Sequence, residues 1–172
     1  MKNIAILGLG SNKGKKQKNL KKAINQIGRD ISNIIRISSL YKTEPRYNRN
    51  QPYFYNMVVK VETHLPPFSL LRACKNIEQR MGRNNKKKLN RKRIIDIDIL
   101  FYDDFILKSE ELTIPHERLY ERNFVLLPLN EIEPSFVDPA TEKTIDTLIK
   151  ECSDRSKVIP GRHFKLQELE RV

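Results

Sequence analysis

The chain has 172 residues, of which 38% are hydrophobic and 31% charged, and its formal net charge is +12. A chain of this length can bury a core without disulfide or metal staples, and the composition is too apolar for a wholly disordered protein. We therefore expect one domain over residues 1–172, with a polar tail at about 153–172.

The sequence contains neither a disulfide framework nor a membrane-spanning run. Its two cysteines, Cys74 and Cys152, read as small apolar residues, and no apolar stretch approaches the roughly 20 residues of a transmembrane helix. The apolar run at residues 4–7 is shorter than the apolar region of a signal peptide. These features predict a cytoplasmic protein with no membrane partner, and we expect it to be a monomer.

The predicted elements follow a β-α-β-β-α-β order. Strands are expected at 3–9, 34–43, 53–63 and 94–102, and helices at 16–30 and from Pro66 to near Gly82, with a loop over 44–52. This order predicts an α+β fold, an α/β sandwich with a ferredoxin-like core and its helices on one face of the sheet. A turn-rich stretch (103–117) and short helices near 119–127 and 144–152 are expected as C-terminal additions.

Two short stretches account for the basic character of the chain. Residues 13–22 contain six lysines, residues 80–93 contain eight basic residues, and neither stretch contains an acid. The first opens the predicted helix 16–30, where its lysines fall mainly off the apolar stripe and suit a solvated face. The second has no apolar period and reads as a loop, either a plain surface loop or one that a polyanion stabilises.

The segment Ile95-Asp96-Ile97-Asp98-Ile99 places two carboxylates on one face of a strand, because side chains alternate. Aspartate is a poor strand former, so a plain polar face is the weaker interpretation. Mg²⁺ binds to one or two carboxylates together with substrate phosphates. Arg83 and Arg93 border the basic loop beside this strand, and metal with arginine is the usual equipment of phosphoryl transfer.

Two further segments carry candidate binding residues. His116 lies beside Pro115 and close to Arg122, which is compatible with a phosphate ligand or with a structural histidine. The run 51–56 contains three aromatic residues and an amide, which can sandwich a flat heterocycle and read its edge, or pack in the core. The run 8–12, Gly-Leu-Gly-Ser-Asn, reads as a tight strand-to-helix turn and not as a phosphate-binding loop, and no Walker motif occurs.

Taken together, these motifs resemble the 6-hydroxymethyl-7,8-dihydropterin pyrophosphokinase family of folate biosynthesis. The resemblance follows the chain in order over about residues 4–135 and rests on residues 9–12, 38–45, 51–56, 82–83, 93–100, 112–116 and 124–129. It implies a ferredoxin-like fold and transfer of the β,γ-pyrophosphoryl unit of ATP to the pterin hydroxymethyl oxygen, with release of AMP.

The resemblance also implies a role for each matching residue. Asp96 and Asp98 would hold two Mg²⁺ ions, and Arg83 and Arg93 would be catalytic. ATP would contact Glu78, Thr113, His116 and Arg122, and the pterin would contact Thr43, Pro45, Tyr53, Phe54, Asn56 and Phe124. Arg91, which does not match the family pattern, is also expected to bind ATP through its charge. The chain departs from the family pattern at Asn90-Arg91-Lys92, where Trp-Gly-Pro is frequent, at Asn85, where a second arginine is found, and at Glu117.

Two other functions remain as alternatives. An RNA-binding module would suit the basic clusters and strand aromatics, but no RNP-like run occurs and the two aspartates would repel phosphate without a metal. A metal-dependent phosphotransferase with another acceptor is the second alternative. We expect ATP and the pterin as partners, and no nucleic acid.

Overall fold

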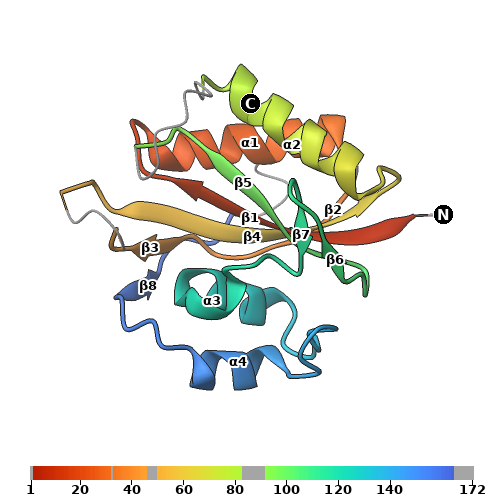
Figure 1. The fold of residues 1–172 in the computed structure, drawn as a ribbon. Coiled ribbons are helices and arrows are strands. Elements are labelled where there is room, and N and C mark those ends of the chain that lie inside the picture. Colours follow the sequence, from red (N-terminus) through yellow and green to blue (C-terminus); the bar gives the residue numbers. More distant parts are fainter. Residues whose placement is uncertain (1, 32, 46–49, 83–91, 165–172) are drawn as a thin grey trace.

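The computed structural model describes residues 2–31, 33–45, 50–82 and 92–164. Within these ranges six strands form one antiparallel sheet in the order β5-β1-β4-β3-β8, and β2 also pairs with β4 (Figure 1). The strands of this sheet are β1 (Asn3–Ser11), β2 (Ile34–Ile37), β3 (Tyr41–Thr43), β4 (Phe54–Thr63), β5 (Asp96–Tyr102) and β8 (Val158–Pro160). A separate hairpin pairs β6 (Leu107–Lys108) with β7 (Thr113–Ile114).

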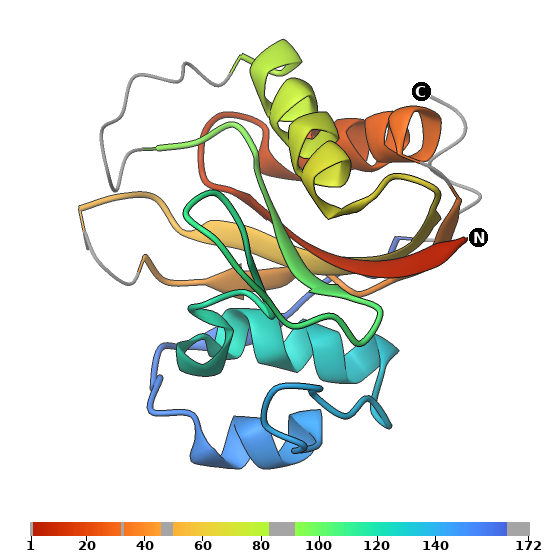
Figure 2. The ribbon, with the colours of Figure 1, turned by 45° about the vertical axis from the view of Figure 1, so that its right-hand side comes forward.

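Helices cover both faces of the sheet (Figures 1 and 2). On one face lie α1 (Lys16–Asp30) and α2 (Pro67–Arg80), and on the other lie α3 (Asn123–Ile132) and α4 (Ile145–Glu151), after a short 3₁₀ turn at Leu119–Glu121. The predicted ferredoxin-like core is confirmed as β1-α1-β2/β3-β4-α2-β5, and α3 and α4 add the second layer. None of the described helices is long and apolar enough to span a bilayer.

Each layer has its own hydrophobic core. Helix α1 buries Leu20, Ala23, Ile24 and Ile27 against the sheet, while Lys15, Lys18 and Lys22 are exposed, as its apolar period predicts. The second core joins α3 and α4 to the other face through Leu126, Leu129 and Leu148. Burial of Leu129 and Ile132 also explains why α3 continues past Pro128 to residue 132, beyond the predicted helix end at 127.

The predicted strand 34–43 is wrong as a single element. It is interrupted at Ser38, whose hydroxyl accepts a hydrogen bond from the Val58 N–H at 2.9 Å while its own N–H donates to the Val58 carbonyl at 2.9 Å. The strand therefore divides into β2 and β3, both of which pair with β4. Because this break depends on an inward-turned serine, β-propensity alone does not reveal it.

Residues 153–164, which the sequence analysis assigns to a polar tail, are ordered against the rest of the domain. This segment forms β8 beside β3, and the Phe164 side chain is 1% exposed in the core beneath α1 and α2. Residues 165–172 lie outside the described part of the chain. A strand added at a sheet edge depends on backbone pairing with a distant partner, which a polar composition conceals.

Candidate active site

The two aspartates of β5 share one face of the sheet, as predicted. Ile95, Ile97 and Ile99 are buried under α1 and α2, so Asp96 and Asp98 point to the opposite face, where α3 lies. Strand β5 pairs with β1 so that Gly10 is opposite Asp96 and Gly8 is opposite Asp98. The residues beside the carboxylates therefore have no side chains, and the floor of the site is open.

The carboxylates lie in a field that favours cations. Burial, followed by the charge of Asp96, raises the pKa of Asp98 above its usual value. An ion pair joins Arg93 Nη1 to Asp96 Oδ2, and His116 Nε2 lies 3.9 Å from Asp98 Oδ2. Two close carboxylates repel each other, and burial disfavours the charged form of Asp98. A bound cation would stabilise both carboxylates in their charged forms.

His116 presents a defined nitrogen to this site. Its Nδ1 accepts a hydrogen bond from the Arg118 N–H at 3.1 Å, which leaves Nε2 as the donor in the neutral ring. Burial lowers the pKa of His116, and the charge of Asp98 opposes that shift. The imidazole is thus aimed at the carboxylates with an N–H group that suits a phosphate oxygen.

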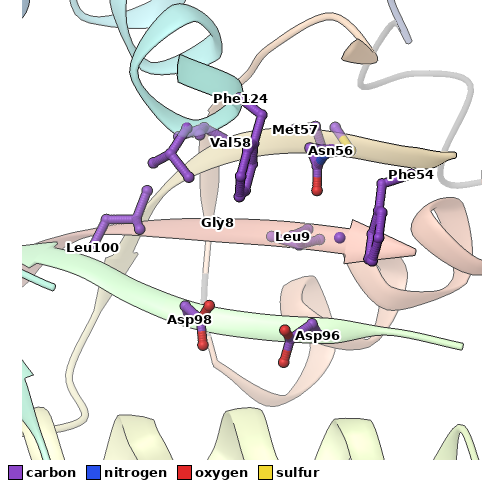
Figure 3. A pocket seen from close by; sticks show the side chains of 12 residues that line it. Gly8, Leu9, Phe54, Asn56, Met57, Val58, Asp96, Asp98, Leu100 and Phe124 are labelled. Carbon is purple, nitrogen blue, oxygen red and sulfur yellow. The ribbon is translucent and has the colours of Figure 1, made fainter. Parts of the chain in front are cut away.

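A pocket opens next to the aspartates on the same face (Figure 3). It is lined by Gly8, Leu9, Gly10, Phe54, Asn56, Met57, Val58, Asp96, Asp98, Leu100, Phe124 and Val125. Figure 3 shows the Phe54 and Phe124 rings on either side of the Asn56 amide, with the two carboxylates across β1. Two rings that flank an amide form a slot for a flat heterocycle with a hydrogen-bonding edge.

The Asn56 amide is held in one orientation. Its Nδ2 donates to Thr43 Oγ1 at 2.6 Å across the β3–β4 pair, and Thr43 is 3% exposed. A Cβ atom at Gly10 would lie 2.8 Å from Asn56 Oδ1, so only glycine leaves that oxygen its present position. Asn56 therefore offers the pocket a fixed carbonyl oxygen that can accept a hydrogen bond from a ligand N–H.

Arg122 supplies a cation with unused bonding capacity. Its Nε atom is buried without a hydrogen-bond partner among the described residues, and its guanidinium carbon lies 5.7 Å from the Phe124 ring centroid. A buried guanidinium N–H without a partner is costly unless a ligand completes it. An anionic group between Arg122 and His116 would satisfy both side chains.

The residues present suit Mg²⁺ bound together with a phosphate ligand. The described residues contain no group of three or more His, Cys, Asp or Glu side chains able to hold a metal on their own. Two carboxylates on one face of β5, near an arginine whose buried Nε lacks a partner among the described residues, are the pattern expected where phosphate oxygens complete the coordination of Mg²⁺.

The structure does not bring every predicted residue into the pocket. Tyr53 packs on the other side of the sheet, where the Lys16 and Lys42 amines lie 3.2 and 4.2 Å from its ring centroid. Pro45 and Thr113 are half-buried outside the pocket lining. Arg83 and Arg91 lie outside the described residues.

Glu78 is buried behind β5. The residue is 1% exposed, and its Oε1 accepts a hydrogen bond from the Ile97 N–H at 2.7 Å. It therefore contacts the backbone between the two aspartates, and it is not part of the pocket lining. This placement points to support of the strand, whereas contact with ATP remains a prediction.

The prediction of a tight turn at residues 8–12 is wrong for residues 8–11. Strand β1 extends to Ser11, so Gly8 and Gly10 lie within it and form the pocket floor. Asn12, which is completely buried, accepts a hydrogen bond from the Arg93 N–H at 2.6 Å and donates one to Gln51 Oε1 at 2.8 Å. Glycines spaced by two residues in an otherwise apolar strand are the signal that a ligand or side chain approaches closely.

A family sequence model, 7,8-dihydro-6-hydroxymethylpterin-pyrophosphokinase (HPPK), matches residues 6–134. The chain belongs to the HPPK family. It is 37% identical over 147 residues to the 2-amino-4-hydroxy-6-hydroxymethyldihydropteridine pyrophosphokinase of Bacillus subtilis, covering 85% of this chain and 87% of that protein. The enzyme of the same name from Haemophilus influenzae is 36% identical, with coverage of 90% and 96%.

Other relatives of this HPPK chain are longer. The folic acid synthesis protein fol1 of Schizosaccharomyces pombe is 45% identical over 83% of this chain, which spans only 19% of that protein. The crystal structure of wild-type Plasmodium falciparum HPPK-DHPS with pteroate matches with a TM-score of 0.74 at 22% identity, covering 88% of this chain and 44% of that one. This second match supports the fold alone.

Proposed function

We propose that this HPPK-family chain transfers pyrophosphate from ATP to 6-hydroxymethyl-7,8-dihydropterin, giving the pterin diphosphate and AMP. The observation that carries the proposal is the placement of Asp96 and Asp98 across a glycine floor from the Asn56 amide, which lies between Phe54 and Phe124. One open face thus combines a carboxylate pair for a metal–phosphate ligand with a slot for a flat acceptor.

The acceptor binds by stacking and by its edge. Phe54 and Phe124 provide the two ring surfaces, and Asn56 Oδ1 accepts from the N–H groups that a pterin carries along one edge. Because Asn56 Nδ2 is already bonded to Thr43, the oxygen keeps its direction when the ligand arrives. The bound ring would extend its hydroxymethyl group toward the aspartates of β5.

The donor binds through its phosphates. Asp96 and Asp98 would hold Mg²⁺, which when bound neutralises phosphate charge and orients the polyphosphate. His116 Nε2 and the free Arg122 Nε provide N–H donors to phosphate oxygens. Arg93, now paired with Asp96, is placed to neutralise charge that develops on the transferred group.

The chemical step is a displacement at phosphorus. The pterin hydroxymethyl oxygen attacks the β-phosphorus of ATP, the bond from that phosphorus to the α,β-bridging oxygen breaks, AMP leaves, and the hydroxyl proton is released. Side chains that fix both reactants in line account for most of the rate in such reactions, because positioning and charge neutralisation dominate phosphoryl transfer.

A product assay tests this function. The protein with MgATP and 6-hydroxymethyl-7,8-dihydropterin is expected to form AMP, and Asp96→Asn should lower the rate by at least about 10³-fold because the metal site loses a charged ligand. Asp104→Asn, an exposed carboxylate beyond the end of β5, serves as the control and should keep full activity. Formation of ADP, or an active Asp96→Asn variant, would refute the proposal.

A binding experiment separates the nucleic-acid alternative. Calorimetry with a non-hydrolysable ATP analogue should show binding that requires Mg²⁺. An RNA-binding module would instead show metal-independent binding that weakens steeply with salt.

A further inference from the structure

Helix α3 begins without a capping side chain of its own. Its first residue is Asn123, and the side chain of the preceding Arg122 makes no capping hydrogen bond. The first N–H groups of a helix have no partners within the helix and are usually satisfied by Ser, Thr, Asp or Asn at the cap. A cation at this end is also unfavourable in the field of the helix dipole. The start of α3 therefore needs a partner from another part of the chain.

Asp154 is that partner. The Asn123 N–H donates to Asp154 Oδ2 at 3.1 Å, and Asn123 Nδ2 donates to the Asp154 carbonyl at 2.7 Å. The other carboxylate oxygen, Oδ1, accepts from the Ser156 N–H at 2.9 Å and from the Ser156 hydroxyl. Asp154 is only 5% exposed. Its bonds to Ser156 orient the carboxylate toward the first residue of α3.

This bond fixes the two site residues that flank Asn123. Phe124 forms one side of the aromatic slot, and Arg122 brings its guanidinium to the same face. Both side chains leave the backbone within one residue of the capped N–H. If the first turn of α3 frayed, the Phe124 ring would lose its position opposite Phe54.

The same C-terminal segment also supports the opposite side of the slot. Strand β8 pairs with β3, with Thr43 opposite Val158, and Thr43 is the residue that holds the Asn56 amide. The Gly161 N–H donates to the Leu40 carbonyl at 2.7 Å, and the Leu40 N–H donates to the Arg162 carbonyl at 2.9 Å. This segment follows the part of the chain, residues 6–134, that the family model matches.

We propose that Asp154 is a positioning residue for the aromatic slot, acting through the first turn of α3 on the binding of the flat acceptor. The inference rests on the proposed function for the identity of that acceptor. The Asp154 carboxylate bonds to Asn123 and Ser156, whereas Asp96, Asp98 and His116 are placed by β5 and by the segment after β7, so we expect the nucleotide to keep most of its ligands when Asp154 is changed. The expected signature is a selective loss of pterin affinity.

The test compares two helix caps of the same protein. Asp154→Ala removes the cap of α3, and Thr144→Ala removes the side-chain cap of α4, where Thr144 Oγ1 accepts from the Thr147 N–H at 3.3 Å. Calorimetry measures the Kd of 6-hydroxymethyl-7,8-dihydropterin in the presence of a non-hydrolysable MgATP analogue, and the Kd of the analogue alone. Thermal unfolding of both variants reports the general cost of losing a cap.

Asp154→Ala should raise the pterin Kd about tenfold, which corresponds to about 1.4 kcal/mol, and should raise the Kd of the MgATP analogue by a clearly smaller factor, because Arg122 is only one of the residues that would bind the phosphates. Thr144→Ala should leave both Kd values unchanged. Asp154→Asn keeps an oxygen acceptor for the Asn123 N–H and should retain most of the pterin affinity. Equal pterin affinity in the two alanine variants would overturn the proposal.

A second variant covers the case in which Asp154→Ala does not fold. Ser156→Ala removes one of the bonds that orient the carboxylate, and hydrogen exchange of residues 123–127 in the free protein should become faster, while exchange within α4 stays constant. Unchanged exchange would also overturn the proposal. Because exchange is measured without ligand, its outcome is independent of whether the wild-type protein binds the pterin, which tests the proposed function separately.

Discussion

Glu78 accepts a hydrogen bond from the Ile97 N–H at 2.7 Å, at the backbone position between Asp96 and Asp98. Within the described ranges β5 is an edge of the sheet, so this N–H points away from β1 and is not paired with another of the described strands. The Glu78 carboxylate, on α2, thus provides the hydrogen-bond acceptor for the edge strand that carries the predicted metal ligands. Lys75 Nζ lies 3.3 Å from Glu78 Oε2 and balances the charge of this buried carboxylate.

The first prediction concerns this bond. Glu78→Ala leaves the buried Ile97 N–H without its acceptor, so we expect a loss of about 1–3 kcal/mol in unfolding free energy together with a lower rate of AMP formation. Glu78→Gln keeps an acceptor and should be milder in both respects. Urea denaturation and the AMP assay measure the two effects. A fully active Glu78→Ala variant would show that the strand holds its aspartates without this support.

The second prediction concerns the glycine floor. An alanine Cβ at Gly10 would lie 2.8 Å from Asn56 Oδ1, so Gly10→Ala should displace the amide and weaken pterin binding roughly tenfold, the usual effect of losing one good hydrogen bond. Gly28→Ala, on helix α1, is the matched control, because its Cβ would make an ordinary 3.6 Å contact with Ile34 of β2. Pterin affinity should not change in the control. Unaltered affinity in Gly10→Ala would argue against edge recognition by Asn56.

The third prediction asks whether Arg93, which precedes β5, acts on turnover or on ATP affinity. Asn12 Oδ1 accepts from the Arg93 N–H, and the Arg93 carbonyl accepts from the Asn12 N–H at 3.1 Å. We expect Arg93→Ala to lower turnover far more than ATP affinity, since the guanidinium acts on charge that develops late. Asn12→Ala should show the same kcat-dominated pattern, because the loop is released.

Asn12→Asp supplies the control for the third prediction. Aspartate still accepts from the Arg93 N–H but cannot donate to Gln51, so its turnover should stay closer to wild type than that of Asn12→Ala. Steady-state kinetics with ATP varied at saturating pterin give kcat and KM for each variant. A change confined to the KM for ATP would contradict the proposed role of Arg93.

The fourth prediction concerns Cys74, which lies on the buried face of α2 in the core between the helices and the sheet. Burial raises the pKa of its thiol to about 12. The native protein should therefore resist alkylation at pH 8.5 and react after denaturation, when the thiol regains a pKa near 8.5.

The free energy of unfolding at alkaline pH should depend on the ionisation of the Cys74 thiol. A folded-state pKa raised above the unfolded value contributes stability that is present below pH 9 and is lost as the pH rises toward about 12. Cys74→Ala should lower stability at neutral pH through the lost packing, yet show a shallower decline between pH 9 and 11 than the wild type. Parallel pH profiles of the two proteins would refute this assignment.

Local patterns in the sequence predicted the elements whose causes are local. The alternation of isoleucine and aspartate at 95–99 placed Asp96 and Asp98 on one face, and the apolar period of residues 20–27 identified the buried side of α1. The same alternation places Phe54 and Asn56 on one face of the sheet and Tyr53 on the opposite face. Adjacent strand residues cannot both face one pocket, so this correction was available from the sequence.

The features that the sequence did not predict depend on distant partners. The break at Ser38 requires Val58, strand β8 requires β3, and the cap of α3 requires Asp154. None of these pairs has a signature in its own neighbourhood, because polar residues satisfied by long-range bonds resemble ordinary loop residues in sequence. In the described part of the site, residues that lie on one strand could therefore be predicted from the sequence, whereas contacts between separate segments could not.

Strand β5 changes phase within its own length. Leu7 is opposite Ile99 and Ile6 is opposite Phe101, so Leu100 is an extra residue, a β-bulge, between them. On one side of the bulge Asp98 faces α3, and on the other side Phe101 packs in the core beneath the same helix. A single strand thus presents to one helix a half that lines the pocket and a half that is fully packed. Because the bulge lies between the two halves, side chains of both halves face α3, although strict alternation along an unbroken strand would turn Phe101 to the opposite face of the sheet.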